Sequence, residues 1–580
     1  MKLVTSELMQ KIDREAINNR GIPSEQLMEN AGRGIAEQMA DYVDPLPDKS
    51  RVAIFCGKGN NGGDGYVVGR YLHQWGHDVT IYFMGPIDKL SNDARLNYDR
   101  ALAEKIAMVE AIKMVEISSP NDLPETIECD IIVDAIFGTG FSGAPRGLSA
   151  DIIEHINSQD AVIVSVDMPS GLNANNGTHE GNVVAADFTF TLAQPKYGLY
   201  LSPGRELAGT VFVVPIGIPD DDVAKFEIKD ELITPDSVST MLPFRKPDGH
   251  KGDFGKLMVL AGSTGMTGAA ALAGESALRS GCGLCKVACP KTVQPVLATK
   301  MTEVMTYPLP DVAKKGALAL RGLGEIRKLL DQHDAVAIGP GIGTHHETGE
   351  LIRRLISTLD KPAVVDADGL NALSGHTDIL KDKKAPLVLT PHPGEFRRLW
   401  DGEYPEEFHD RTEVARQFAS TYGVILVLKG SPTIVADPNG RCFVNQSGNS
   451  GMATGGSGDV LTGIIGSFLA QGMAALDAAI AGVFIHGLAG DIAANDLTER
   501  AMIASDMTDA LPEVFELLEC AEYKMAIEVR RGVRGKYCSS CKVWKPLTEF
   551  HKDSSHRATQ GGRHCRCKPC YKAGRKRLGY

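Results

Sequence analysis

The sequence predicts an α/β protein with two consecutive α/β domains and a small basic module at its C-terminal end. Its 580 residues are enough for several domains of about 100–200 residues each. Short apolar segments alternate twice with helical segments, which is the pattern of a parallel sheet covered by helices. Charge and cysteine content then change sharply near residue 530. The apolar content of 43% with ordinary charge content favours soluble, globular domains.

The first fifty residues are expected to form two helices. Met9, Ile12 and Ala16 recur at helical spacing, which predicts one buried helix face. Ser24 is a residue type that commonly caps a helix, so we expect it to cap the second one.

No membrane segment or secretory signal is predicted. The uncharged stretch 257–274 is interrupted by glycine, serine and threonine, so it favours a buried strand and a turn. At the N-terminus, acidic residues occur before any apolar run long enough for a signal. The expected compartment is therefore the cytoplasm.

From Arg51 the sequence has the alternation of a parallel α/β domain. The segments in order are strand 51–56, glycine loop 57–65, helix 66–76, and strands 77–85, 130–137 and 161–169. We expect a three-layer domain at residues 1–222, followed by an acidic, weakly periodic linker at residues 223–234.

A second alternation of strands and helices predicts a larger α/β domain at residues 235–518. Its expected strands lie in 255–262, 334–343, 361–373, 386–395 and 424–436. After the last of these comes a glycine-dense loop at residues 447–460, and two glycine-containing helices follow it.

The loop 57–65, with the sequence GKGNNGGDG, is similar to the fingerprint of a dinucleotide site. Two features argue against an ordinary dehydrogenase. The strand 77–85 ends without the acidic residue that would hold a ribose, and the loop carries Asn60, Asn61 and Asp64. We therefore expect the loop to bind a ligand in a different pose.

Polar residues also follow other strands of the first domain, at the sheet edge where ligands bind in α/β proteins. Asn61, Asp134 and Ser170 are oxygen donors with little charge, which suits a monovalent cation or a polar, water-filled pocket. The alternative is that each aspartate caps the helix that follows it.

The second domain carries the features of a phosphate site beside an acid. In residues 447–460, glycines allow backbone N–H groups to approach an anion, and the following helix start adds its positive dipole end. Asp459 stands at that point, where a carboxylate would repel phosphate unless it had a chemical role. The alternative is a glycine-rich turn with a capping aspartate.

Four further segments of this domain join a strand to a helix or a turn, so they are expected at the same sheet edge. They are 262–270, 339–343, 390–399 and 428–433. Within them, Lys429 either binds phosphate or is simply an exposed lysine. His392 and Glu395 are either a metal pair or a turn with a capping glutamate.

Four motifs in the first half resemble the NAD(P)H-hydrate epimerase family, which has a Rossmann-like fold. They are MQKIDREAINNRGIPSEQLMENAGRG, GKGNNGGDG, VDAIFGTGFSG and VDMPSGLNANNG. The resemblance implies interconversion of the R and S forms of hydrated NADH and NADPH, potassium at Asn61, Asp134 and Ser170, and an acid/base role for Asp167. It implies a substrate site made of Asn60, Asn61, Gly62, Gly63, Asp64, Gly138, Thr139, Gly140, Phe141, Ser142, Gly143, Ala144 and Asp167.

The second half resembles the ADP-dependent NAD(P)H-hydrate dehydratases of the ribokinase-like superfamily, through MTGAAALAGESALRSGCG, VVDADGLNAL, LTPHPGEF and GNSGMATGGSGDVLTGII. The resemblance implies that Asp459 is the catalytic base. It implies ADP binding by Lys429, Gly430, Ser431, Pro432, Thr433, Asn449, Ser450, Gly451, Met452, Ala453, Thr454, Gly455, Gly456, Ser457 and Gly458. It implies contact with the hydrated nucleotide for Ala270, Gly343, His392, Pro393, Gly394, Glu395, Phe396, Arg397, Arg398 and Asp459.

Together the two halves predict a bifunctional repair enzyme for hydrated NAD(P)H. A base that deprotonates the ring hydroxyl would let a phosphoryl donor turn it into a leaving group, so that ADP yields AMP and phosphate with magnesium. The rival enzyme class is a ribokinase-like small-molecule kinase. The expected partners are the hydrated nucleotides, ADP and further copies of the chain, but no membrane.

The C-terminal module, residues 530–580, matches neither half. It carries 15 lysines and arginines against Glu549 and Asp553, a net charge of +13, while residues 1–529 carry −25. Five of the twelve cysteines lie in it, and the two C-x2-C pairs predict structural zinc with Cys565 and His564 as alternative ligands. The basic surface suits nucleic acid, and the alternative is a zinc-stabilised appendage. The predicted zinc ligands are Cys538, Cys541, Cys567 and Cys570.

Overall fold

The computed structural model describes most of the chain up to residue 519 and short segments beyond it. The described residues are 1–43, 49–103, 112–245, 248–313, 315–402, 408–519, 528–530, 533–537, 544–546, 550–552 and 563–567. Two compact units meet along the chain between Asp230 and Glu231, a point inside the predicted linker at 223–234. Each unit is described by itself.

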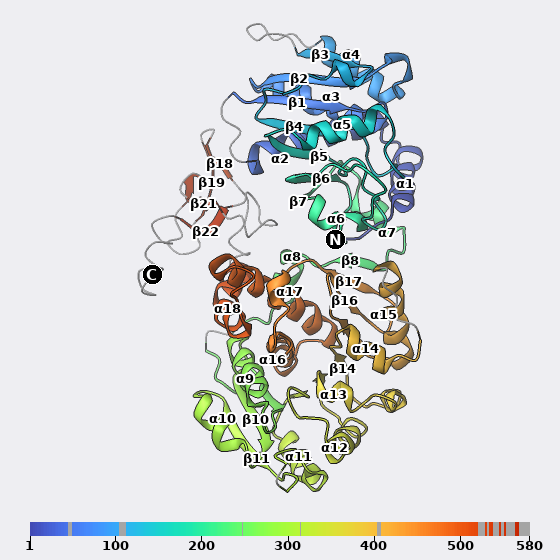
Figure 1. The fold of residues 1–580 in the computed structure, drawn as a ribbon. Helices are drawn as coiled ribbons and strands as arrows, with labels where there is room; N and C mark the ends of the chain where they lie inside the picture. The colour runs from blue at the N-terminus through green and yellow to red at the C-terminus, as the bar shows by residue number, and fades with distance from the viewer. Residues whose placement is uncertain are drawn as a thin grey trace. The chain divides into compact units, whose positions relative to one another are not determined.

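The first unit is built on a seven-stranded parallel sheet with strand order β3-β2-β1-β4-β5-β6-β7 (Figure 1). Its strands are β1 (Arg51–Cys56), β2 (Asp78–Met84), β3 (Lys113–Ile117), β4 (Ile131–Ala135), β5 (Val162–Val166), β6 (Phe188–Leu192) and β7 (Thr210–Val214). Its α-helices are α1 (Ser6–Arg14), α2 (Ser24–Tyr42), α3 (Asn60–Gln74), α4 (Asn92–Ala103), α5 (Leu148–Asn157), α6 (Gly204–Leu207) and α7 (Asp220–Ala224).

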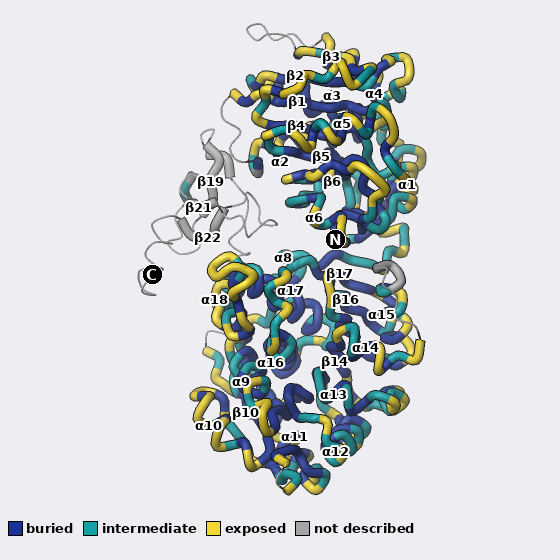
Figure 2. The backbone as a smooth tube through the Cα atoms, viewed as in Figure 1, coloured by how far each residue is buried: buried dark blue, intermediate teal, exposed yellow. Residues whose placement is uncertain are grey.

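Alternation along the buried strands explains the three layers of this unit. In β1, Val52 and Ile54 pack with α2, α3 and α4 on one face, while Ala53 and Phe55 pack with α5 on the other. Successive side chains of a strand point to opposite faces, so one apolar run serves two cores. Figure 2 shows the strands of this sheet as largely buried. The predicted three-layer α/β fold is confirmed.

Two local predictions in this unit are wrong. Helix α3 begins at Asn60 rather than at residue 66, because the glycine loop itself supplies the first turns of the helix. A Cβ at Gly62 would lie 2.0 Å from the carbonyl oxygen of Gly57, so the glycine allows close packing of the helix start on the preceding strand end. Ser24 is the first residue of α2 and makes no capping bond, since the capping position is Pro23.

The second unit has a ten-stranded sheet with strand order β11-β10-β9-β12-β13-β14-β15-β16-β17-β8. The seven strands β9 to β15 run parallel, while β15, β16 and β17 are antiparallel neighbours. The strands are β8 (Asp230–Leu232), β9 (Lys256–Leu260), β10 (Leu284–Pro290), β11 (Met305–Leu309), β12 (Ala335–Ile338), β13 (Ala363–Val365), β14 (Leu387–Leu389), β15 (Ile425–Leu428), β16 (Thr433–Ala436) and β17 (Cys442–Asn445).

Helices cover both faces of this sheet, so the second predicted α/β domain is also confirmed. They are α8 (Pro235–Met241), α9 (Thr267–Arg279), α10 (Gln294–Lys300), α11 (Leu323–Leu330), α12 (His346–Ile356), α13 (Asp368–Asn371), α14 (Pro393–Leu399), α15 (Phe408–Tyr422), α16 (Ser457–Ala470), α17 (Ala475–Leu497) and α18 (Ala504–Glu519).

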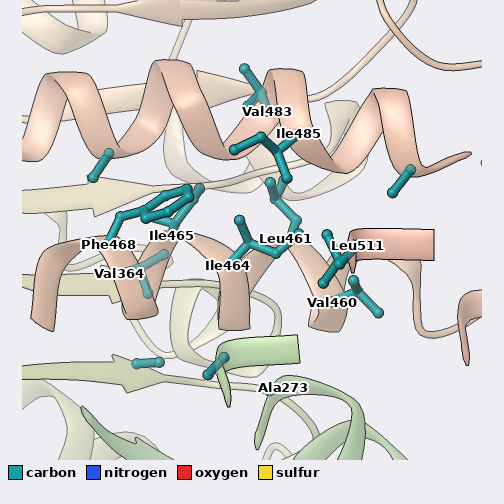
Figure 3. Packing of buried hydrophobic residues seen from close by; sticks show 14 of the residues in the cluster. Ala273, Val364, Val460, Leu461, Ile464, Ile465, Phe468, Val483, Ile485 and Leu511 are labelled. Carbon is teal, nitrogen blue, oxygen red and sulfur yellow. The ribbon is translucent and has the colours of Figure 1, made fainter. Parts of the chain in front are cut away.

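The largest core cluster of this unit surrounds α16. Figure 3 shows Val460, Ile464 and Phe468 of α16 with Val483 and Ile485 of the neighbouring α17. Helix α17 is the one helix of the described residues with the length and composition to cross a membrane, but 78% of its most apolar window is buried inside the unit. Its apolar surface is therefore accounted for by packing within this core.

The described part of the C-terminal region consists of short strands: β18 (Glu528–Arg530), β19 (Val533–Tyr537), β20 (Trp544–Pro546), β21 (Phe550–Lys552) and β22 (Arg563–Cys567). Strands β18, β19 and β20 pair in antiparallel fashion, and β21 pairs with β22. The predicted zinc ligands Cys538, Cys541 and Cys570 lie outside the described residues, and for Cys567 only the strand position is described.

Candidate active sites

Asp167, the first residue after β5, is the centre of the site in the first unit. Its side chain is 6% exposed, and its backbone φ of 66° is left-handed, which is rare for a residue other than glycine. Its Oδ1 accepts hydrogen bonds from Lys196 Nζ at 2.7 Å and Leu192 N at 3.2 Å, and its Oδ2 accepts one from Thr139 N at 3.1 Å. Such backbone strain costs roughly 1–3 kcal/mol and persists where surrounding bonds determine it.

Lys196 is the partner that sequence reasoning missed. Its side chain is 1% exposed, and besides Asp167 its Nζ donates to Thr191 Oγ1 at 3.1 Å and to Leu192 O at 2.6 Å. Burial alone would raise the pKa of Asp167, but the charge and hydrogen bond of Lys196 lower it below its ordinary value. Asp167 is thus held ionised. The signal in the sequence was a lone lysine close after the buried strand FTFTL.

Two further carboxyl groups near Asp167 have raised rather than lowered pKa values. Asp64, on α3, is 6% exposed, and burial together with the charges of Asp167 and Asp13 raises its pKa well above the ordinary value. On α1, burial raises the pKa of Asp13 to about 6, although the charge of Lys196 opposes it. Carboxyl groups whose pKa values are pushed apart in one site can serve as proton donor and acceptor.

Asp134 and Ser170 lie against each other next to this cluster. Ser170 Oγ donates to Asp134 Oδ1 at 2.5 Å, while Ser170 N and Ser165 Oγ donate to Asp134 Oδ2 at 2.8 and 2.9 Å. Burial raises the pKa of Asp134, and the bonds from Ser170 and Ser165 oppose that rise. These contacts hold the Ser170 side chain, four residues after β5, against Asp134 near the end of the neighbouring strand β4.

Gly138 connects Asn61 to Asp167. A Cβ at Gly138 would lie 3.1 Å from both Asn61 Oδ1 and Asp167 Oδ2, so the missing side chain leaves these two groups facing the same space. Asn61 Nδ2 is buried without a hydrogen-bond partner among the described residues. By contrast, Asn60 is exposed and its Oδ1 accepts a hydrogen bond from Ser91 Oγ at 2.8 Å.

The other residues predicted to line this site differ in their burial and in their contacts with Asp167. Gly62 and Gly63 are buried by packing, and a Cβ at Gly63 would lie 2.5 Å from Met28 Sδ. Thr139 contributes only its backbone N–H to Asp167, and the ring of Phe141 stacks on Phe137. The positions Gly140, Ser142, Gly143 and Ala144 lie in the same loop and make no described contact with Asp167.

The second unit builds its site around Asp459, in the first turn of α16. The helix begins after Gly456, whose φ of 96° is left-handed, and its positive dipole end therefore lies at the glycine loop. Burial raises the pKa of Asp459 to about 7, the carboxylate of Asp366 adds to that rise, and the charge of Lys429 opposes it. A group with this pKa exchanges protons readily at neutral pH.

Lys429 follows β15 and lies beside the start of α16. Its Nζ is 2.9 Å from Asp366 Oδ1 and 3.9 Å from Glu395 Oε2, and its side chain is 21% exposed. Burial alone would lower the pKa of Lys429, but the charges of Asp366 and Glu395 outweigh burial and raise it. A Cβ at Gly458 would lie 3.3 Å from this ammonium group, so the two face each other. Lys429 is therefore a cation next to the glycine loop.

Side chains of α17 hold the glycine loop in place through hydrogen bonds. Asp491 accepts hydrogen bonds from Gly448 N at 2.9 Å and from Asn449 Nδ2 at 3.0 Å. His486 Nε2 lies 2.9 Å from the carbonyl oxygen of Ser457, and burial lowers the pKa of this histidine to about 4, so it is neutral. A Cβ at Gly455 would meet no atom within 4 Å, which leaves that part of the loop accessible.

The rest of the predicted nucleotide segments form turns around this loop. Thr433 Oγ1 donates to Gly430 O at 3.1 Å, which closes the turn through Ser431 and Pro432 between β15 and β16. Gly451 packs against Glu499 and Met502. The loop positions Ser450, Met452, Ala453 and Thr454 are partly or fully exposed.

His392 and Glu395 form a capping box rather than a metal pair. The backbone N–H groups of Gly394 and Glu395 donate to His392 Nδ1, and His392 N donates to Glu395 Oε2 at 2.9 Å. This is the alternative in which the glutamate caps a turn. Among the described residues, no group of three or more His, Cys, Asp or Glu side chains is arranged to hold a metal ion.

Not all residues predicted to contact the hydrated nucleotide have accessible side chains. Phe396 and Ala270 are 0% exposed, so their side chains belong to the core instead. Arg398 donates to Asn371 Oδ1 at 2.8 and 3.1 Å, whereas Arg397 is exposed and Pro393 is partly exposed. Gly343 N donates to Asp368 Oδ2 at 2.9 Å, which places this loop next to the strand end that carries Asp366.

Comparisons with known proteins cover both units. Residues 257–513 match the family described as NAD(P)H-hydrate dehydratase, and residues 24–198 match the family described as YjeF-related protein N-terminus. A bifunctional NAD(P)H-hydrate repair enzyme of Moorella thermoacetica is 42% identical over 519 residues, covering 90% of this chain and 97% of that protein. The corresponding enzyme of Escherichia coli is 36% identical over 87% of this chain and 92% of its own length.

One solved structure is similar to the second unit in sequence. It is an ADP/ATP-dependent NAD(P)H-hydrate dehydratase from Bacillus subtilis, co-crystallised with ATP and Mg²⁺, at 32% identity and a TM-score of 0.44. The match covers 50% of this chain and 99% of that chain.

Proposed function

The chain belongs to the family of bifunctional NAD(P)H-hydrate repair enzymes, and from this premise we propose how its residues divide the two reactions. The first unit is the epimerase for the R and S forms of hydrated NADH and NADPH. The second unit is the dehydratase, which restores NAD(P)H from the S form. The observation that carries the assignment of roles is that each unit places one aspartate, buried in the first unit and partly buried in the second, near one lysine at a strand end or helix start.

In the epimerase unit, Asp167 is the proposed proton acceptor. Its ion pair with Lys196 keeps it ionised, while the raised pKa values of Asp64 and Asp13 keep nearby carboxyl groups available as proton donors. Inversion at the hydroxylated ring carbon requires one bond of that carbon to break and re-form on the other face, and a proton acceptor and a proton donor in one site can move the protons that this exchange needs.

In the dehydratase unit, Asp459 is the proposed base for the ring hydroxyl. Lys429 and the N-terminal end of α16 face the same loop, where they would bind the phosphates of ADP. Once deprotonated, the hydroxyl can attack the terminal phosphorus of ADP, and AMP leaves. The C–O bond of the phosphorylated hydroxyl then breaks and releases phosphate, and a proton leaves the neighbouring ring carbon, which forms the ring double bond of NAD(P)H.

The decisive experiment supplies purified R and S hydrates of NADH separately, with ADP or ATP, and follows the absorbance of reduced nicotinamide. Recovery from both epimers is expected with the intact protein. A stable phosphorylated substrate in place of NADH would support the rival kinase. Recovery from S but not from R would remove the epimerase assignment.

Magnesium would enter with the nucleotide. Mg²⁺ commonly keeps several waters and binds through phosphate oxygens with only one or two carboxylates, and the described residues hold no larger protein metal site. The relative from Bacillus subtilis was co-crystallised with ATP and Mg²⁺, which supports this cofactor. EDTA is expected to stop dehydration of the S hydrate and to leave conversion of R to S intact.

Potassium is proposed for the epimerase unit, at Asn61, Asp134 and Ser170. Their oxygens fit a weakly charged, hard-donor set, and Asp134 is held in place by its bonds to Ser170 and Ser165. Conversion of R to S should fall when potassium chloride is replaced by choline chloride at equal ionic strength. An unchanged rate would argue against the ion.

For the C-terminal module we keep the proposal of a structural zinc ion at Cys538, Cys541, Cys567 and Cys570, with nucleic acid as a possible ligand of its basic surface. The spacing of the cysteines supports it. Metal analysis of the intact protein should give one zinc per chain, and Cys538→Ser with Cys541→Ser should remove it. Retention of zinc in that double variant would reject these ligands.

A further inference from the structure

Asp366 is a buried carboxylate that the two proposed reactions do not use. It follows β13 directly and is 1% exposed. The next residue, Ala367, has a φ of 48°, so the chain turns sharply at this point. A buried carboxylate is unfavourable unless it is paired and hydrogen-bonded, so its contacts indicate why it is there.

Each oxygen of Asp366 contacts a different element of the dehydratase unit. Oδ1 lies 2.9 Å from Lys429 Nζ, at the end of β15. Oδ2 accepts a hydrogen bond from Thr462 Oγ1 at 2.8 Å. Thr462 lies three residues after Asp459 on α16, and residues at that spacing share a helix face. One carboxylate therefore connects a lysine of the sheet edge to the helix that carries the proposed base.

Gly458 confirms how closely these groups approach each other. A Cβ at this position would lie 3.3 Å from Lys429 Nζ and 3.4 Å from Asp366 Oδ2. The first turn of α16 thus lies directly on the ion pair. A movement of the Lys429 ammonium would change the space in which the phosphate loop meets its ligand.

We propose that Asp366 is a positioning residue of the dehydratase, which holds the Lys429 ammonium against the first turn of α16 so that it faces the phosphates of ADP beside Asp459. This inference rests on the proposed function, because it takes Lys429 as the ADP contact and Asp459 as the base. Asp366 itself would touch neither ADP nor the hydrated nucleotide.

The first test compares ADP binding by Asp366→Asn with that of the intact protein, by calorimetry without hydrate. The variant keeps the shape but loses the charge that fixes Lys429, so the Kd for ADP should rise roughly tenfold or more. Asp378→Asn is the matched control, because it removes one carboxylate from an exposed ion pair with Lys381 in the same unit. Its Kd should be unchanged.

The second test is the pH profile of S-hydrate dehydration, which a merely structural role would not move. The charged groups that face Asp459 are Asp366, Asp368 and Glu395, which raise its pKa, and Lys429, which lowers it. Removing the charge of Asp366 should therefore shift the rising limb of activity to lower pH. If a folded Asp366→Asn variant kept both the pH profile of dehydration and the Kd for ADP of the intact protein, the proposal would be wrong.

A double variant keeps the test decisive if Asp366→Asn alone fails to fold. Removing the closest carboxylate of the largely buried Lys429 ammonium is destabilising, because only Glu395 at 3.9 Å then balances its charge, whereas removing both members of the ion pair is often neutral. Asp366→Asn with Lys429→Met should therefore recover the melting temperature but not ADP binding. If the two substitutions act additively on ADP affinity, Asp366 does not act through Lys429 and the inference is wrong. If the intact protein itself did not dehydrate the S hydrate, that result would contradict the proposed function instead of this inference.

Discussion

Lys196 makes the site of the first unit depend on one buried ion pair. Its ammonium group is enclosed with Asp167, Thr191 and a backbone carbonyl, and its side chain is only 1% exposed. Removing one member of such a pair leaves the other charge buried and unpaired. The residue therefore affects both stability and the protonation of Asp167.

Lys196→Met is predicted to destabilise the first unit by roughly 3–5 kcal/mol and to raise the pKa of Asp167, because the lysine charge is what lowers it. Conversion of the R hydrate should fall at least tenfold, whereas S-hydrate dehydration should persist. Urea unfolding and separate assays with each epimer would measure both effects. Arg95→Gln is the control, since it breaks an exposed pair with Asp99 and a contact with the ring of Tyr98, both within α4. Normal use of R hydrate by Lys196→Met would contradict the role.

Asp459 gives a prediction for the pH dependence of the second reaction. A base must be deprotonated to act, and the pKa of Asp459 is raised to about 7 by burial and by neighbouring carboxylates. The rate of S-hydrate dehydration should therefore rise with pH through a midpoint near 7 and fall away below it. Asp459→Ala should remove dehydration at every pH while ADP binding survives. A pH-independent rate between 5 and 9 would argue for a different base.

At the scale of elements, the beginning of α3 shows what the glycines of GKGNNGGDG do. The sequence indicated a loop, but Asn60 to Gly65 are helical. A Cβ at Gly62 would lie 2.0 Å from the carbonyl oxygen of Gly57, and one at Gly63 would lie 2.5 Å from Met28 Sδ of α2. The glycines are needed where helix and strand approach closely, so they support the site by packing.

Gly62→Ala is therefore predicted to destabilise the first unit by several kcal/mol and to abolish conversion of R to S, because its Cβ would overlap the carbonyl group of Gly57. Gly59→Ala is a matched control in the same segment: its φ of −89° is ordinary and a Cβ would meet no atom within 4 Å. Thermal unfolding and R-hydrate assays would separate the two. Equal stability of both variants would show that the helix start can move freely.

The polar residues at strand ends were predictable from the sequence, but the side chains that contact them were not. Asp134, Asp167 and Lys429 each follow an apolar run, so their place at a sheet edge follows from local pattern. Lys196 and Asp366 act through contacts that no local pattern encodes, since Thr462 lies 96 residues beyond Asp366. Phe396 was expected at the site through the family resemblance, and its side chain packs in the core of the second unit.

At the scale of the whole molecule, two complete sites on one chain suggest that the epimers pass between them through solution. Hydration produces both epimers, and only one is a substrate for dehydration, so the first unit supplies the second. Nothing in the described residues of either unit requires the hydrated nucleotide to stay bound between the two steps.

Complementation between inactive variants would test this independence. Asp167→Asn should use only the S hydrate, and Asp459→Ala should only interconvert the two epimers. An equimolar mixture of both variants should therefore recover NADH from the R hydrate at a rate within a few-fold of the intact protein. Failure of the mixture, with each variant folded, would show that the two sites must reside on one molecule.

The contact between Asp366 and Thr462 also bears on how the protein is made. The ammonium of Lys429 is held by a carboxylate 63 residues earlier and by a helix that is translated afterwards. While the chain is still on the ribosome, the nucleotide site cannot assemble until α16 has emerged and packed. A nascent chain that ends before residue 457 should therefore have no affinity for ADP, even though all seven parallel strands of its sheet, β9 to β15, are already complete.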